Sequence, residues 1–250
     1  MSATLTSSRA FADSVILVTG GTSGIGLAIA EAFLDAGASV AVCARAQPGL
    51  DAFMARHPGT LAISADVTDP RDRTAMLDTV EARFGRVDIL VNNAGVLIER
   101  DFTRADDVCE GLDDEVALNL TAPIALASAV LARWPTPRAL VFVTSGYALV
   151  SPTRAPTYGA VKAGLHGYVE GLRRQLAGRA TQVLEVLPPA VDTPATRHSS
   201  AAKIPPRHVA DATLKALVAR RPLALVGQTR LLPLMLRLAP RMIGRIVAAT

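Results

Sequence analysis

Three side chains in the second half of the chain are of the types that carry out acid–base chemistry. Tyr158 and Lys162 are four residues apart, and Ser145 lies thirteen residues before the tyrosine. Positions i and i+4 share one face of a helix, so the lysine ammonium group can lie beside the phenol. A nearby positive charge favours phenolate and lowers the tyrosine pKa, which is about 10 in a free side chain. The pattern predicts a tyrosine that exchanges a proton with a carbonyl or alcohol oxygen held by Ser145.

A tyrosine and a lysine at this spacing also occur by chance on the surface of amphipathic helices, so the rest of the chain must support the chemistry. The chain has 250 residues and half of them are hydrophobic, which suits one large α/β domain or two small ones. Apolar runs alternate with amphipathic stretches, and no linker divides them. This order predicts a single doubly wound domain around a parallel sheet, spanning residues 1–250.

The expected strands are rich in Val, Ile and Leu without polar alternation, as in a parallel sheet covered on both faces. There are seven of them: Val15–Thr19, Ser39–Cys43, Leu61–Ser64, Val87–Val91, Ala139–Thr144, Gln182–Leu187 and Leu223–Val226. The expected helices lie between them: Ile25–Ala36, Arg71–Phe84, Asp114–Arg133, Thr157–Leu176 and His208–Arg220.

Composition argues against several classes of function. The net charge is +4 with the basic residues dispersed, whereas a nucleic-acid-binding protein would cluster them on one face. Cys43, Cys109 and the four histidines lack the spacing of metal ligands, so no metal site is predicted. Neither a signal peptide nor an uninterrupted apolar run of spanning length is evident, and free thiols suit a reducing compartment. We expect a cytoplasmic protein without integral membrane association.

A glycine-rich loop follows the first expected strand. The stretch Thr19–Gly26 reads Thr-Gly-Gly-Thr-Ser-Gly-Ile-Gly and leads directly into a helix. Glycines permit a tight turn and let backbone N–H groups approach a pyrophosphate, which the helix N-terminus also favours. The spacing is G-x-x-x-G-x-G rather than the commoner G-x-G-x-x-G. The alternative is an ordinary glycine turn, but its place after the first strand favours phosphate binding.

The loop after the second strand indicates which nicotinamide cofactor binds. Sites for NAD usually carry an acidic residue there, which binds the ribose hydroxyls. This chain has Ala44 followed by Arg45, and a guanidinium group pairs well with a 2′-phosphate. NADP(H) is therefore favoured. The alternative is a solvent-facing arginine, with NAD(H) bound without discrimination.

Together these motifs resemble the short-chain dehydrogenase/reductase family over nearly the whole chain. The glycine loop and the Ser145, Tyr158 and Lys162 set are joined by several short matches in the expected order: Asp66-Val67, Asn92-Asn93-Ala94-Gly95, Asn119 and Pro188 through Thr193. The sequences around Ser145 and Tyr158, and the run Pro-Pro-Ala-Val-Asp-Thr, look most like the branch of DltE-type oxidoreductases. The resemblance implies a Rossmann-type fold and the interconversion of a carbonyl and a secondary alcohol by hydride transfer.

The resemblance also implies roles for the catalytic residues. Tyr158 is the acid–base, Ser145 binds the reacting oxygen, and Lys162 binds the nicotinamide ribose as well as biasing the tyrosine. Asn119 helps to hold a water that links Lys162 to bulk solvent. Taken alone, Ser145 could be a hydroxyl at a strand end and Asn119 a polar residue in a helix. The joint pattern favours the catalytic reading.

Cofactor contacts are implied along the same edge of the sheet. Asp66 and Val67 hold the adenine, although Asp66 could merely cap the turn before Pro70. Residues 93–95 pack beneath the adenosine, and the loop after the sixth strand fixes the carboxamide. The implied set is Gly20, Thr22, Ser23, Gly24, Ile25, Gly26, Arg45, Asp66, Val67, Asn93, Ala94, Gly95, Tyr158, Lys162, Pro188, Val191 and Thr193.

One residue departs from the family pattern. Pro189 stands where a glycine is usual, and because proline fixes φ and lacks an N–H, the loop should be stiffer there. Residues 194–206 are expected to form a lid over the substrate. Apolar walls are expected from Val96-Leu97-Ile98, Tyr147, Val150 and Pro189. Arg154 and Arg197 could meet an anionic group but are more often solvated.

The C-terminal segment 231–250 is apolar apart from regularly spaced arginines, as in an amphipathic helix interrupted by Pro233 and Pro240. It could lie on an anionic membrane, but packing or a subunit contact is favoured. Small residues on the helices 114–133 and 157–176 predict a homodimer or homotetramer. The partner is a small carbonyl or alcohol substrate. The main alternative is a catalytically silent NADP-binding sensor or scaffold, which the intact Ser145, Tyr158 and Lys162 set disfavours.

Overall fold

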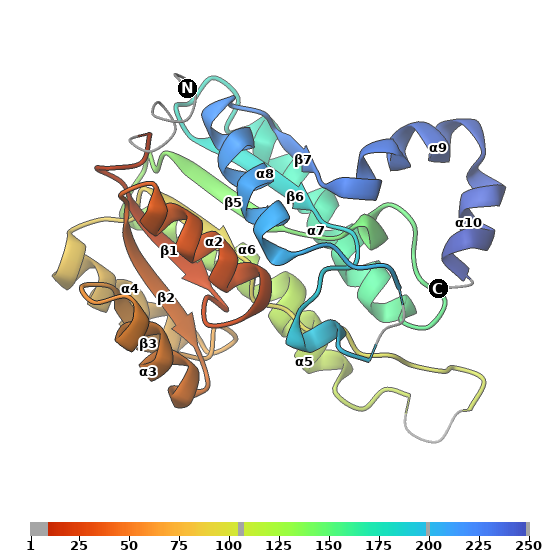
Figure 1. Cartoon of the computed structure of the whole chain (residues 1–250), viewed down its shortest axis with the longest axis horizontal. Helices are drawn as coiled ribbons and strands as arrows, with labels where there is room; N and C mark the ends of the chain where they lie inside the picture. The colour runs from red at the N-terminus through yellow and green to blue at the C-terminus, as the bar shows by residue number, and fades with distance from the viewer. Residues whose placement is uncertain (1–9, 105–107, 199–200, 249–250) are drawn as a thin grey trace.

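The computed structural model describes residues 10–104, 108–198 and 201–248. Its centre is a seven-stranded sheet, parallel throughout, with the strand order β3-β2-β1-β4-β5-β6-β7 (Figure 1). The strands are β1 (Val15–Thr19), β2 (Ser39–Ala44), β3 (Leu61–Ser64), β4 (Ile89–Asn92), β5 (Ala139–Val143), β6 (Gln182–Leu187) and β7 (Leu223–Leu225). The prediction of a single Rossmann-type domain with a parallel seven-stranded sheet is confirmed.

Helices cover both faces of the sheet and enclose two apolar cores (Figure 1). One face is covered by α2 (Gly24–Asp35), α3 (Gln47–Arg56) and α8 (Pro206–Val218). The other is covered by α4 (Pro70–Phe84), α6 (Ala122–Arg133) and α7 (Pro156–Gln175). Alternate residues of each strand enter opposite cores: Ile16 and Val18 pack with α2, while Leu17 packs with α6 and α7. Burial on both faces explains the uninterrupted apolar character of the strands.

Local signals set the ends of the helices. Asp69 accepts a hydrogen bond from the Arg71 amide and caps α4, whose last turn ends at Gly85 in the left-handed conformation. The expected boundaries agree to within two residues in most elements. Helix α3 was not predicted, because Pro48 and Gly49 at its start resemble a loop. It forms because only Leu50 and Phe53, one turn apart, need to be buried.

The expected helix 114–133 is longer and is not uniform. It comprises α5 (Leu112–Val116), a π-helical turn η1 (Ala117–Thr121) and α6. By length and composition, the stretch Leu112–Arg133, which contains an 18-residue window with a mean hydropathy of 1.6, could cross a membrane, which was not expected from the sequence. The core helix of a soluble protein passes the same test, and Leu126 and Val130 of α6 are fully buried against the sheet. The membrane signal is therefore weak.

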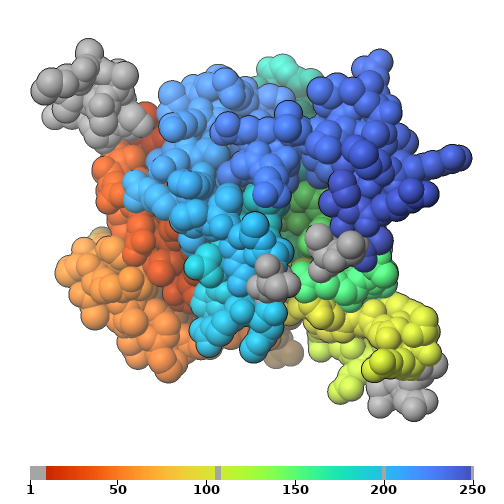
Figure 2. Space-filling model, turned by 45° about the vertical axis from the view of Figure 1, so that its right-hand side comes forward, coloured from red at the N-terminus to blue at the C-terminus, as the bar shows by residue number. Residues whose placement is uncertain are grey.

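The chain ends in a short 3₁₀ turn η4 (Gly227–Leu231) followed by two short helices, α9 (Leu232–Leu238) and α10 (Pro240–Ala248). They turn away from the layered body at one end of the molecule (Figure 1) and form the upper right part of the surface in the space-filling view (Figure 2). The two prolines that interrupt the segment, Pro233 and Pro240, lie in the first turns of α9 and α10, where proline is tolerated.

Candidate active site

Ser145 lies immediately after β5, where the strand ends at the carboxyl edge of the sheet. Its backbone is extended, and its Oγ accepts a hydrogen bond from the Tyr147 amide at 3.1 Å. That bond starts the 3₁₀ turn η2 (Gly146–Ala148) and fixes the serine side chain. The Tyr147 ring packs edge-to-face against the Tyr158 ring, with 6.4 Å between centroids. The turn η2, which follows Ser145, therefore contacts the first turn of α7, which carries Tyr158.

Tyr158 and Lys162 lie one turn apart on α7, as the spacing predicts. The Ser145 side chain lies near enough to the Tyr158 hydroxyl to lower its pKa. The Lys162 ammonium lies 5.7 Å from the centroid of the Tyr158 ring, and it donates a hydrogen bond to the Val143 carbonyl at 3.2 Å. Lys162 is buried, which is rare for lysine without a partner. The structure therefore brings the three predicted side chains together.

The pKa values of the pair shift in opposite directions. Burial raises the pKa of Tyr158 to about 12; the Ser145 side chain opposes this rise, while Tyr147 and Glu115 add to it. Burial lowers the pKa of Lys162 to about 8. The sequence pattern predicted a lowered tyrosine pKa, but burial raises it, and Lys162 is not among the groups that shift it. Desolvation disfavours the charged phenolate.

Asn119 lies in the π-helical turn η1, a rare conformation that is frequent at functional sites. Its fully buried side chain holds the backbone of Val96 in both directions: Nδ2 donates to the Val96 carbonyl at 2.8 Å and Oδ1 accepts from the Val96 amide at 3.2 Å. A Cβ on Gly95 would lie 2.5 Å from Asn119 Oδ1 and 3.5 Å from Lys162 Nζ. Only glycine at position 95 therefore lets Asn119 and Lys162 approach the same backbone.

A buried ion pair supports these elements and was not predicted from the sequence. The Arg100 guanidinium group pairs with the Glu115 carboxylate, and both side chains are almost completely buried. Thr157, which precedes Tyr158, donates to Glu115 Oε2 at 2.8 Å and accepts from Arg100 Nη1 at 2.9 Å. Arg100 also donates to the carbonyls of Val108 and Glu110. The cluster ties Arg100, residues 108–110, α5 and the start of α7 together.

A second unpredicted group lies behind Ser145. Glu185 of β6 is fully buried, accepts a hydrogen bond from Thr144 Oγ1 at 2.8 Å, and lies 2.9 Å from His166 Nδ1. His166 is one of the four histidines that lack metal-ligand spacing, and its ring bonds with this carboxylate. Arg154 was considered for anion binding, and it pairs with Glu99. These partners lie far apart in the sequence.

The glycine loop has the tight geometry predicted for it. A Cβ on Gly26 would lie 2.2 Å from the Gly20 carbonyl oxygen, so the helix packs directly on the loop. Gly24 has a φ of 54°, and a Cβ there would lie 3.0 Å from Thr193 Cγ2, so this loop touches the loop after β6. Ser23 is exposed, and among the described residues its side chain caps no helix amide. The first amides of α2 are thus available to an anion.

The neighbouring predicted residues complete this turn. Thr22 lies against α3, because a Cβ on Gly49 would come within 3.1 Å of its Oγ1. Ile25 is half-buried in the first turn of α2 and packs on the adjacent core. Both residues therefore hold the glycine loop against the rest of the protein.

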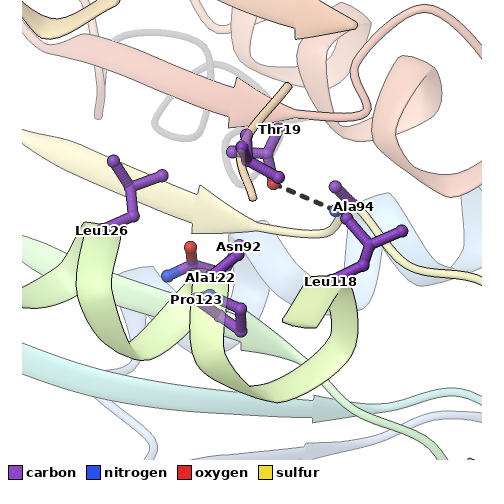
Figure 3. Close-up of a pocket in the computed structure, with 8 residues that line it drawn as sticks. Thr19, Asn92, Ala94, Leu118, Ala122, Pro123 and Leu126 are labelled. Carbon is purple, nitrogen blue, oxygen red and sulfur yellow. Dashed lines mark hydrogen bonds between the residues drawn. The ribbon is translucent and has the colours of Figure 1, made fainter. Parts of the chain in front are cut away.

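The hydroxyl of Thr19 joins the glycine loop to residues 93–95. Thr19 Oγ1 accepts from the amides of Asn93 and Ala94, each at 3.0 Å. Figure 3 shows the bond to Ala94. Asn93 Nδ2 returns a bond to the Thr19 carbonyl at 2.9 Å. These contacts lie where β1 and β4 run side by side and the strand order reverses. In open α/β sheets, ligands bind at such a switch point.

Figure 3 shows a small cavity beneath this junction. Residues of β1, β4 and α6 line it, among them Thr19, Asn92, Ala94 and Leu126. Ala94 belongs to the segment after β4, so this segment lines the cavity as well as bonding with Thr19.

Arg45 and Asp66 stand together at the ends of β2 and β3. Arg45 Nη1 lies 4.0 Å from Asp66 Oδ2, and three quarters of the arginine side chain is exposed. Asp66 Oδ1 accepts from the Thr68 side chain at 2.7 Å and its amide at 2.9 Å; these bonds, rather than Arg45, mainly lower the Asp66 pKa. Asp69, not Asp66, caps the helix that starts at Pro70. Val67 is buried beside them.

The loop after β6 returns to the site. The Pro188 carbonyl accepts from the Gly146 amide at 3.1 Å, which ties the loop to the residue after Ser145. Val191 is buried and forms a parallel bridge with Ile204. Thr193 starts a 3₁₀ turn, η3 (Pro194–Thr196). The expected lid 194–206 thus begins with a turn and rejoins the loop at Ile204; its residues 199–200 lie outside the described ranges.

The sheet, the switch point and the serine–tyrosine–lysine group define a class of dinucleotide-dependent oxidoreductases. Residues 14–204 match the family described as short chain dehydrogenase, and the chain belongs to that family. The family assignment made from the sequence motifs is confirmed.

Individual relatives agree with this assignment. The chain is 35% identical to the uncharacterized oxidoreductase DltE of Bacillus subtilis over 184 residues, covering 72% of this chain and 73% of that protein. It is 34% identical to the 3-oxoacyl-[acyl-carrier-protein] reductase FabG of Escherichia coli over 193 residues, 75% and 77% of the two chains. A short-chain dehydrogenase from Sphingobium yanoikuyae, solved with NADPH, is 30% identical with a TM-score of 0.74, over 84% and 87%. The expected likeness to the DltE branch is confirmed.

Proposed function

We propose that this oxidoreductase reduces a small carbonyl compound to a secondary alcohol with NADPH, and catalyses the reverse oxidation. The observation that carries the proposal is the convergence of Ser145, Tyr158 and Lys162 at the end of β5 and the start of α7, where Tyr147 bonds with the serine and packs on the tyrosine ring. A protein that only bound the cofactor would not need this group.

Each residue has a distinct part in the proposed reaction. The Ser145 hydroxyl donates a hydrogen bond to the substrate oxygen and orients it. The Tyr158 phenol gives its proton to that oxygen as the oxygen gains negative charge. Lys162 holds positive charge beside the ring, and Asn119 positions the backbone of Val96 next to it. A bound nicotinamide would supply the hydride.

The pKa shifts favour the reductive direction near neutral pH. With its pKa raised to about 12, Tyr158 stays protonated and acts as a proton donor. With its pKa lowered to about 8, Lys162 remains mostly charged at neutral pH and loses this charge as the pH rises through 8. Oxidation needs tyrosine as a base and therefore requires higher pH.

The residues at the switch point fit a dinucleotide. The uncapped N-terminus of α2 and the exposed Ser23 suit the pyrophosphate, and Gly26 packs closely enough to bring the helix to it. Asp66 and Val67 lie at the adenine end, residues 93–95 pack beneath the adenosine, and the loop from Pro188 to Thr193 lies at the nicotinamide end. The Sphingobium yanoikuyae relative was solved with NADPH.

Arg45 is the basis for proposing NADP(H) over NAD(H). Its side chain is largely exposed at the end of β2 and is only loosely paired with Asp66, so it is free to contact a 2′-phosphate. Arg45→Ala should weaken NADPH binding by about 1–3 kcal/mol and leave NADH binding almost unchanged. Titration of both cofactors checks this, with Arg56→Ala, also exposed, as the control. Equal losses of affinity for NADPH and NADH would show that Arg45 does not contact the 2′-phosphate.

The central test is the variant Tyr158→Phe. It should retain the fold and NADPH affinity while losing turnover of the best substrate from a panel of ketones and aldehydes, because only the proton donor is removed. Tyr168→Phe on the same helix is the matched control and should keep its activity. Substantial turnover by Tyr158→Phe would overturn the catalytic assignment. A wild type that binds NADPH but turns over nothing in the panel would favour the sensor alternative.

A further inference from the structure

The last two helices carry a basic, apolar surface that the proposed chemistry does not use. We call residues 231–248, comprising the end of η4 with α9 and α10, the C-terminal arm. Among the described residues, nine large apolar side chains are exposed to solvent, and five of them belong to this arm. They are Leu231, Leu234, Leu238, Met242 and Ile246.

The exposed side chains form one face on each helix. Leu231, Leu234 and Leu238 are spaced by three and four, so they line one side of α9, and Leu238 is 74% exposed. Met242 and Ile246, spaced by four, line one side of α10. The buried Ile243 lies about 100° around α10 from Met242 and anchors the helix. The exposed stripe therefore borders the side of α10 that packs on the protein.

The charges around this exposed face are all positive. From residue 212 to the C-terminus the sequence holds no Asp or Glu but seven basic residues: Lys215, Arg220, Arg221, Arg230, Arg237, Arg241 and Arg245. At 3.6 residues per turn, Arg245 lies about 60° around α10 from Met242, so charge borders the apolar face. Among the described residues, Arg237, Arg241 and Arg245 form no ion pair.

We propose that the C-terminal arm lies on an anionic lipid surface. Apolar side chains bordered by arginine suit a lipid interface, where the side chains enter the acyl boundary and the guanidinium groups meet lipid phosphates. A second copy fits less well, because a two-fold contact would bring the same arginines of both copies together without an acidic side chain from this segment. The proposal concerns peripheral binding, not a membrane span.

The arm is attached firmly beside the site. Thr229, in η4, donates to the Leu187 carbonyl at 2.7 Å, at the end of β6. A Cβ on Gly146 would lie 3.0 Å from Thr229 Cγ2 and 3.6 Å from Leu232 Cδ2. The base of the arm therefore packs on the residue that follows Ser145. Lipid binding by the arm would place the carboxyl edge of the sheet near the membrane surface.

Flotation of the full-length protein with vesicles tests the proposal. The protein should float with vesicles containing phosphatidylglycerol and not with phosphatidylcholine alone, and high salt should weaken binding. One variant reverses three arm charges and should bind at least about tenfold more weakly: Arg237→Glu, Arg241→Glu and Arg245→Glu. A control variant makes the same charge change on exposed residues elsewhere and should bind like the wild type: Arg71→Glu, Arg174→Glu and Arg179→Glu.

A third variant, Leu234→Asn with Leu238→Asn, removes apolar surface without changing charge and should also lose binding. Both leucines are exposed, so the fold should survive, as a melting curve would check. The proposal is overturned if the wild type does not float with anionic vesicles, or if the arm and control charge variants weaken equally. It is also overturned if the leucine variant floats like the wild type but falls in mass by light scattering, because the face would then be a subunit contact.

Discussion

Replacing Arg100 with methionine should destabilise the protein through the carboxylate it leaves behind. Methionine keeps much of the apolar volume of the arginine stem but removes the guanidinium group from a site that is 3% exposed. Glu115, at 0% exposure, would then keep only the Thr157 hydroxyl as a hydrogen-bond donor to Oε2. The carbonyls of Val108 and Glu110 would also lose their donor.

The expected magnitude follows from this burial. Breaking a buried ion pair by removing one partner costs about 3–5 kcal/mol, since the remaining charge is uncompensated. At about 2–4 °C per kcal/mol for a chain of this size, the melting temperature should fall by roughly 6–20 °C. Arg104→Met is the control: Arg104 pairs with Asp101 but is 87% exposed, and its loss should cost at most about 0.5 kcal/mol.

A double-mutant cycle separates the ion pair from general packing damage. Arg100→Met, Glu115→Gln and the double variant should be compared by thermal melting and by denaturant unfolding at one protein concentration. The double variant should be less destabilised than the sum of the single variants, because each single variant leaves a lone buried charge and the double variant leaves none. Additive effects, or a loss below about 1 kcal/mol for Arg100→Met, would refute this account. Turnover should also fall, since Thr157 precedes Tyr158, the proposed proton donor.

Three further predictions concern the site and the assembly. The rate of ketone reduction should fall as the pH rises through about 8, where Lys162 loses its charge. In initial-rate measurements against pH, Lys162→Arg should reduce this fall, because arginine keeps its charge. An unchanged fall would show that Lys162 is not the titrating group. Gly26→Ala should abolish NADPH binding in fluorescence titrations, because its Cβ would lie 2.2 Å from the Gly20 carbonyl oxygen, whereas Gly167→Ala, with open space, should bind normally. Gly171→Gln should lower the mass seen by light scattering from an oligomer toward 26.1 kDa, since nothing lies within 4 Å of a Cβ there; a wild type of that mass would rule out the oligomer.

The strands were predictable because burial on both faces leaves an unmistakable apolar run. The main exception at a boundary is β4, which begins at Ile89 rather than at Val87. There the Asp88 carboxylate accepts from the Val15 amide at 2.7 Å, so the residue before the strand caps β1. This contact depends on the fold and leaves no local pattern.

The site was predictable only where its residues are close in sequence. The Tyr158 and Lys162 pair follows from helical spacing, but the direction of the tyrosine pKa does not, because desolvation depends on the packing of distant segments. The buried partners Arg100 and Glu115 are fifteen residues apart and carry no motif. Glu185 did leave a signal, since it is the single charged residue within the apolar run of β6. A charge in a buried strand implies a partner, here His166.

The parallel sheet has a further consequence for how the chain tolerates change. All the proposed chemistry lies at the carboxyl edge, so the loops that enter β3, β4 and β6 lie at the opposite edge and serve only as connections. Gly59, Gly85 and Gly178 in these loops have φ values of 89°, 80° and 81°, and nothing lies within 4 Å of a Cβ on any of them. Such exposed turns are where domain insertions and circular permutations succeed. New termini or a fused domain at residue 178 would thus leave the dinucleotide cleft and the arm intact.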